Sequence, residues 1–231
     1  MAKRGKRLKK ALSQVDRTRT YALQEAVDTL KSLPAAKFDE TVDIAFRLGI
    51  DPRQGDQTVR GAVSLPHGTG KDVKVVVIAT GDTAAAAEAA GADLVGYEDV
   101  LERIKGGWLE FDVMIATPQT MQKVRTLGRV LGPRGLMPNP RTGTVTDDPA
   151  AAVSEAKKGR VEYRADRTGC VHVPVGKVSF TAEALVANTE VVVNEVRRAK
   201  PETIKGQYLL SCTLSSTMGP GIKLAISGGN A

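Results

Sequence analysis

The sequence is poor in cysteine, histidine and aromatic residues, and it has no long apolar run. Its 231 residues include two cysteines, two histidines and only 4% aromatic residues. Cys170 and Cys212 form no CxxC motif, and each lies in an alternating strand-like run, so we expect reduced thiols in a core. No stretch of about 18 apolar residues is present and the N-terminus lacks an apolar signal core, so we expect a cytoplasmic protein without a membrane partner.

Motifs for catalysis and cofactor binding are also missing. Gly68-Thr-Gly-Lys71 resembles the end of a phosphate-binding loop, but that loop needs Gly at position 65 and Ser or Thr at 72, where Leu65 and Asp72 stand. The turn Ala79-Thr-Gly-Asp82 lacks the three glycines of a dinucleotide site, and Gly-x-Ser-x-Gly is absent. The two histidines have no carboxylate cluster or metal-ligand spacing around them. We therefore predict no enzyme, no cofactor and no metal site.

Positive charge is in excess. Lys and Arg number 33 against 26 for Asp and Glu, which gives a formal net charge of +7 and favours a polyanionic partner. Residues 3–10 hold six basic side chains and no acidic one, and their repulsion predicts a basic arm without stable structure of its own. The arm is either a solvated tail or a segment ordered by phosphates. Residues 117–146 hold five basic side chains and no acidic one.

The two ends of the chain share one hydrophobic pattern. Apolar residues alternate with polar ones over 42–50 and 59–65, which predicts two half-buried strands forming an antiparallel pair. The alternation returns from Val161 and again over 208–214. Helical spacing from Leu23 to the stop at Pro34, and over 181–199, predicts amphipathic helices.

The middle of the chain has a different hydrophobic pattern. Continuous apolar runs at 73–79 and 111–116, with a short run at 94–95, alternate with helical stretches at 83–90, 98–104 and 149–158. Repeated βα units predict a small parallel sheet with helices on both faces. We therefore predict an α/β fold of two domains. An α+β two-layer domain of residues 1–67 plus 160–231 receives an inserted, three-layer Rossmann-like domain of residues 68–159, and two chain crossings form a hinge.

Two segments carry information about binding. Gly128 to Pro140 contains three glycines and three prolines, which predicts a stiff, exposed, irregular loop that presents Arg129 and Arg134. Hydroxyl side chains recur from Ser211 to Thr217 along a predicted strand and into the turn that follows. Such a row suits contacts to phosphate and ribose oxygens, and an ordinary solvated sheet face explains it equally well.

The loop Gly128 to Pro140 resembles the signature loop of ribosomal protein one of the large subunit. Three other segments agree with the same family in the same order: Lys37-Phe-Asp-Glu-Thr41, Arg60-Gly-x-Val-Ser-Leu-Pro-His-Gly68 and Thr217-Met-Gly-Pro220. The resemblance runs from the basic N-terminus to about residue 224. It implies the same two-domain fold, a monomer within the ribosome, and binding to large-subunit ribosomal RNA.

The resemblance also implies a mobile stalk near the exit site that assists release of deacylated tRNA. In many bacteria, members of this family also bind a similar RNA fold in their own messenger RNA and repress its translation. The resemblance implies the same second role for this chain. The alternatives are a basic RNA-binding protein without specificity and, less favoured, a nucleotide-using enzyme.

The resemblance places the RNA site on the first domain. It implies that Phe38 and Met218 cover a sugar or base face, Thr217 bonds a ribose hydroxyl and Gly219 lets the backbone approach; the competing interpretation makes Phe38 and Met218 core residues. Positions that match the family motifs predict RNA contacts for Lys37, Phe38, Thr41, Thr217, Met218 and Gly219. Further candidates are chosen because they are basic or carry a hydroxyl and lie in the first domain: Arg53, Arg60, Arg164, Lys177 and Ser211. Secondary contacts to phosphates are expected from Arg129, Arg134 and Arg141.

Overall fold

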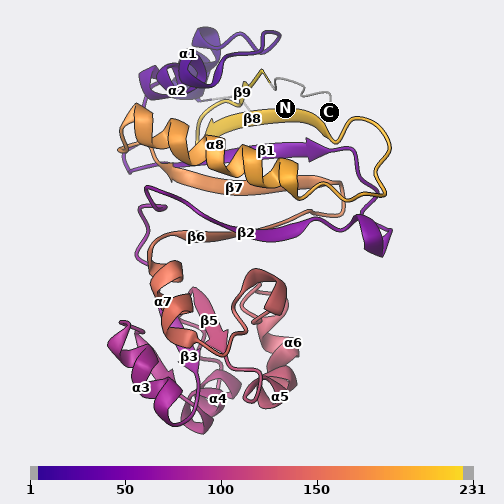
Figure 1. Cartoon of the computed structure of the whole chain (residues 1–231). Helices are drawn as coiled ribbons and strands as arrows, with labels where there is room; N and C mark the ends of the chain where they lie inside the picture. Colours follow the sequence, from indigo (N-terminus) through magenta and orange to yellow (C-terminus); the bar gives the residue numbers. More distant parts are fainter. Residues whose placement is uncertain (1–4, 226–231) are drawn as a thin grey trace. The chain divides into compact units, whose positions relative to one another are not determined.

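A computed structural model describes residues 5–225 (Figure 1). The chain separates into two compact units: unit 1 consists of Met1–Gly70 and Val161–Ala231, and unit 2 of Lys71–Arg160. The unit boundaries lie at 70/71 and 160/161, where the sequence predicted 67/68 and 159/160. Both units combine helices with sheets, so the predicted α/β fold class is confirmed.

A four-stranded antiparallel sheet forms the centre of unit 1. Its order is β7-β1-β8-β9, with β1 at Thr41–Leu48, β7 at Cys170–Lys177, β8 at Leu209–Ser216 and β9 at Ile222–Lys223. Buried and partly exposed positions alternate along β1, as the period-two pattern predicts. Residues that pair directly across strands point to the same side, so the polar positions of β7, β1 and β8 share one face.

Two helices bury the apolar positions of this sheet in a single core. α2 spans Leu23–Ser32 and α8 spans Ala182–Arg198, which Figure 1 shows running along the sheet. α8 begins at Thr181, whose hydroxyl accepts a hydrogen bond from the N–H of Ala184. Asn188 of α8 is fully buried; it accepts from the N–H of His67 and donates to the carbonyls of Gly68 and Val175. The helix thereby fixes the end of the segment that leaves unit 1.

The predicted pairing of the first two strands is wrong. β2 (Arg60–Ser64) pairs with β6 (Arg160–Arg164) in a separate two-stranded sheet, and a short 3-10 helix, η1 (Gly55–Gln57), precedes β2. Both edges of β1 are occupied by β7 and β8. Alternation shows which face of a strand is buried, but it contains no information about which strand is the neighbour.

The basic arm is a helix over most of its length, which corrects the expectation of an unstructured segment. α1 spans Lys6–Gln14, and residues 3 and 4 lie outside the described residues. Ala11 and Val15 are buried, and the guanidinium of Arg7 donates to the carbonyls of Pro34 and Met218. Contacts with the rest of unit 1 therefore stabilise a helix that its own charge disfavours.

Unit 2 has three layers. Its parallel sheet has the order β4-β3-β5, and Val76 and Ile78 of β3 pack into one core while Val75 and Val77 pack into another. The two cores lie on opposite faces because successive side chains of a strand alternate. The regular elements are β3 (Val75–Ile78), α3 (Asp82–Ala89), β4 (Leu94–Gly96), α4 (Glu98–Lys105), β5 (Val113–Ala116), α5 (Met121–Val124), η2 (Arg125–Leu127), α6 (Gly128–Leu131), η3 (Pro140–Thr142) and α7 (Pro149–Lys157).

The glycine- and proline-rich segment is more regular than predicted. Its first four residues form the helix α6, and Leu131 is fully buried in a core of unit 2. The N–H of Gly132 donates to the carbonyl of Gly128, and Gly135 adopts a left-handed φ of 73° where the chain turns. One buried leucine and local hydrogen bonds thus outweigh the low helix propensity of glycine.

The two cysteines differ in burial. Cys212 is buried in the core of unit 1, and burial raises the pKa of its thiol to about 12. Cys170 opens β7 on the polar side of the sheet and is only partly buried, so the expectation of a core thiol is wrong there. Both thiols are free.

Candidate nucleic-acid interface

The turn at residues 217–219 is bonded to the start of β1. The N–H of Thr217 donates to the carbonyl of Thr41, and the Thr217 hydroxyl accepts from the N–H of Thr41 at 3.0 Å. The same hydroxyl lies 3.2 Å from the Thr41 carbonyl. Gly219 closes the turn by donating to the carbonyl of Ser216. The hydroxyl of Thr217 therefore joins the turn to the strand, and its contact with a ribose stays a prediction.

Two large apolar side chains are displayed at this end of the sheet. Phe38 and Met218 are each 54% exposed, so the interpretation that places them in the core is wrong. Among the described residues, the other large apolar side chains with comparable exposure are Val130 and Leu210. An exposed aromatic ring and a flexible thioether beside a hydrogen-bonded turn are suited to covering a sugar or base face.

A buried carboxylate lies beneath the turn. Glu40 accepts hydrogen bonds from Arg7 Nη1 at 3.2 Å, the N–H of Ala36 at 2.9 Å, Ser216 Oγ at 2.7 Å and the N–H of Met218 at 2.9 Å. Burial alone would raise the pKa of Glu40, but these hydrogen bonds and the charge of Arg7 outweigh it and hold the pKa below its ordinary value. Glu40 is therefore a charged acceptor at neutral pH.

Gly219 is required by a close approach. A Cβ at this position would lie 2.4 Å from Ser216 Oγ, the hydroxyl that donates to Glu40. Its φ does not lie in the left-handed region, so the constraint is space and not backbone conformation. Gly219 thus permits the packing of the turn itself, a role that the sequence motif alone does not reveal.

Basic side chains flank the turn. Lys37 is exposed on the segment that precedes β1. Lys177, at the end of β7, lies opposite Thr41 and its Nζ donates to Thr41 Oγ1 at 3.0 Å. The structure therefore brings together seven predicted residues at one end of the sheet: Lys37, Phe38, Thr41, Lys177, Thr217, Met218 and Gly219.

The polar face of the sheet continues from this turn and carries residues that the predicted RNA-binding set does not include. Asp43 pairs with Ser215, and Arg47 pairs with the predicted residue Ser211. Burial raises the pKa of Asp43, while the charges of His172 and Lys177 act in the opposite direction. His172 is exposed on β7. The alternation of β1 and β7 already placed these side chains on the face opposite the core, and that signal was available in the sequence.

Three predicted arginines do not lie at the turn. Arg53 follows the far end of β1, and that end lies about 23 Å along the strand from Thr41 at the usual rise per residue. Arg60 and Arg164 lie in the two-stranded sheet, where Arg60 pairs with Glu162 at 3.5 Å. All three lie in unit 1 as predicted from their placement, and their contact with RNA stays a prediction.

The secondary candidates lie in unit 2. Arg129, in α6, Arg134, in the turn that follows, and Arg141, in η3, are all exposed. Arg141 is held locally because its N–H donates to the side chain of Asn139. These guanidinium groups are available to phosphates, and their contact with RNA stays a prediction.

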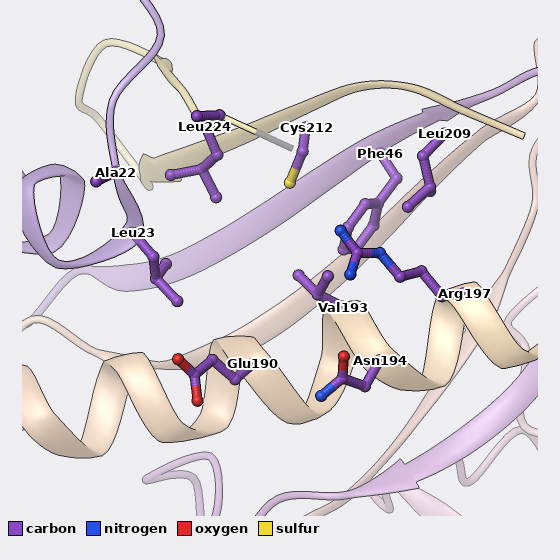
Figure 2. Close-up of a pocket in the computed structure, with 11 residues that line it drawn as sticks. Ala22, Leu23, Phe46, Glu190, Val193, Asn194, Arg197, Leu209, Cys212 and Leu224 are labelled. Carbon is purple, nitrogen blue, oxygen red and sulfur yellow. The ribbon is translucent and has the colours of Figure 1, made fainter. Parts of the chain in front are cut away.

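A cavity of about 560 Å³ lies in unit 1 against α8 (Figure 2). Phe46, Leu209, Cys212 and Leu224 give it a largely apolar lining, and the polar groups come mainly from α8, including Arg197. Within residues 5–225, no three His, Cys, Asp or Glu side chains form a group that could hold a metal ion. The same residues include no helix that is long and apolar enough to cross a bilayer.

Comparison with known families identifies the chain. Residues 30–220 match the model of the ribosomal protein L1p/L10e family, and this range contains all four segments on which the resemblance rests. The chain belongs to this family. It is a large-subunit ribosomal protein that binds ribosomal RNA, and it functions on the ribosome. The predicted family is thus confirmed.

Proposed function

We propose that the chain builds the mobile stalk beside the exit site by gripping a folded segment of large-subunit ribosomal RNA with unit 1. The observation that supports this most directly is the exposure of Phe38 and Met218 around a turn whose three backbone N–H groups all donate hydrogen bonds within unit 1. Lys37 and Lys177 hold phosphates, and the hydroxyls of β8 meet 2′-hydroxyl groups. RNA shape is then recognised with few contacts to base edges.

Unit 2 supplies the secondary contacts. Its exposed arginines reach phosphates, and the two chain crossings act as a hinge between the units. Within the ribosome the chain works as a monomer in the cytoplasm, without catalysis, and the stalk guides deacylated tRNA away from the exit site. A site that reads shape also accepts a similar fold in the chain's own messenger RNA, which supports a second role as a translational repressor.

Binding to a stalk-type ribosomal RNA fragment and to a scrambled RNA, at several salt concentrations, tests the proposal. Met218→Ala should weaken binding to the stalk fragment about tenfold, because most of the apolar surface of the Met side chain, worth about 1.5 kcal/mol, would no longer be buried against RNA. Binding to the scrambled RNA should not change. Leu210→Ala is the matched control, because Leu210 is 45% exposed on β8 but lies away from the turn.

Equal losses for Met218→Ala and Leu210→Ala would contradict the proposed site. Loss of the preference for the stalk fragment as salt rises would instead indicate a binder that works through charge alone. The tRNA role is tested by the release rate of deacylated tRNA from ribosomes with and without the chain, and the repressor role by a reporter that carries the chain's own leader sequence.

A further inference from the structure

Both backbone groups of Met218 are held from inside the protein. Its N–H donates to Glu40 Oε2 at 2.9 Å, and its carbonyl accepts from Arg7 Nη2 at 2.9 Å. Glu40 is only 4% exposed, whereas the Met218 side chain projects into solvent. The backbone conformation of the turn is therefore set by a buried carboxylate and a partly exposed guanidinium of the protein itself.

Arg7 and Glu40 also join three segments that are distant in the sequence. They bond to each other at 3.2 Å, Arg7 donates to the carbonyl of Pro34, and Glu40 accepts from the N–H of Ala36. Helix α1, the segment that carries Lys37 and Phe38, and the end of β8 consequently meet on one ion pair. The relative positions of Phe38 and Met218 depend on that pair.

We propose that Glu40, together with Arg7, is a positioning residue for the RNA interface, which sets RNA affinity without contacting RNA through its own side chain. This inference rests on the proposed function. A turn that is ordered before binding loses little conformational entropy when RNA arrives. Without the carboxylate, the turn samples other conformations and Met218 meets RNA in the productive orientation only part of the time.

Glu40→Gln tests the role, because glutamine keeps the size of the side chain but replaces one acceptor oxygen with an NH2 group. Glu25→Gln is the matched control: Glu25 pairs with Arg19 at 2.8 Å in the same unit, and the change in net charge is identical. Affinity for the stalk fragment and for scrambled RNA is measured together with hydrogen exchange of the Met218 amide, at a temperature where all variants are folded.

Glu40→Gln should lose about tenfold in stalk-fragment affinity and exchange its Met218 amide faster, with binding to scrambled RNA equal to that of Glu25→Gln. Unchanged stalk affinity would overturn the positioning role. Met218→Ala, measured in parallel, separates the two proposals. If it weakens binding while Glu40→Gln does not, only the positioning role is overturned; if neither variant has an effect, the proposed site is overturned as well.

Ser216→Ala keeps the test decisive if Glu40→Gln does not fold. It removes one donor to the carboxylate and leaves the charge pair in place. Faster exchange of the Met218 amide with weaker stalk binding would support the positioning role. Faster exchange with unchanged stalk binding would overturn it, because the turn would then be loosened without consequence for RNA.

Discussion

Gly219→Ala should destabilise unit 1 through a single steric contact. The added Cβ would lie 2.4 Å from Ser216 Oγ, and the backbone of Gly219 has no left-handed φ that alanine would resist. Ser216 must therefore turn its hydroxyl away from Glu40, which it bonds at 2.7 Å. A hydrogen bond to a charged group contributes about 1.5–3 kcal/mol, so we expect a loss of about 2 kcal/mol in the free energy of unfolding.

Urea unfolding followed by circular dichroism measures this loss. Trp108, the single tryptophan, lies in unit 2, so its fluorescence reports that unit separately and should not change. Gly55→Ala is the control, since no heavy atom lies within 4 Å of the Cβ it would add. In a Ser216→Ala background the hydroxyl is gone, and Gly219→Ala should then cost less than about 0.5 kcal/mol. Additive costs of the two substitutions would refute the reasoning.

Four further predictions concern unit 1. The pKa of Glu40 lies below its ordinary value of 4.5, so the ionised carboxylate contributes its full stabilisation above pH 4.5 and loses it as pH falls through the pKa of the folded state. Urea unfolding measured down to about pH 3 should show this loss of stability. The Glu40→Gln variant should not show it. Asn188→Leu should cost about 3 kcal/mol in the same assay, because three backbone groups lose their partner. Cys170 should react with iodoacetamide at about pH 8 while Cys212 does not, as scored by mass spectrometry. Replacing Lys6, Lys9 and Lys10 of α1 with glutamine should reduce the slope of log RNA affinity against log salt concentration by roughly 2–3. The preference for the stalk fragment should not change.

The architecture of unit 2 was predictable because its signals are local. Continuous apolar runs such as Val75–Ile78 are buried on both faces, and each is followed within a few residues by a helical stretch. A βα succession leaves few topologies once parallel strands and short connections are required. The predicted three-layer arrangement follows from these two facts alone.

Unit 1 was predictable in its elements but not in its pairings. The alternation over Thr41–Leu48 identified the strand and its buried face, yet both partners of β1 come from the other end of the chain. The conformation of the basic N-terminal segment likewise depends on distant residues, because Arg7 donates a hydrogen bond to the carbonyl of Met218, more than 200 residues later. Charge repulsion destabilises this segment in isolation, and it matters less once one of the charges forms an ion pair in the folded protein.

The position of Glu40 was nevertheless encoded in the strand that follows it. Glu40 has the same parity as Val42 and Ile44, so the alternation that buries those residues also directs a carboxylate towards the core. A buried carboxylate requires several donors, and of the four that Glu40 has, only the N–H of Ala36 is close to it in the sequence. The other three come from distant parts of the chain. These are Arg7, Ser216 and the N–H of Met218, and they join the turn at residues 217–219 to the buried carboxylate.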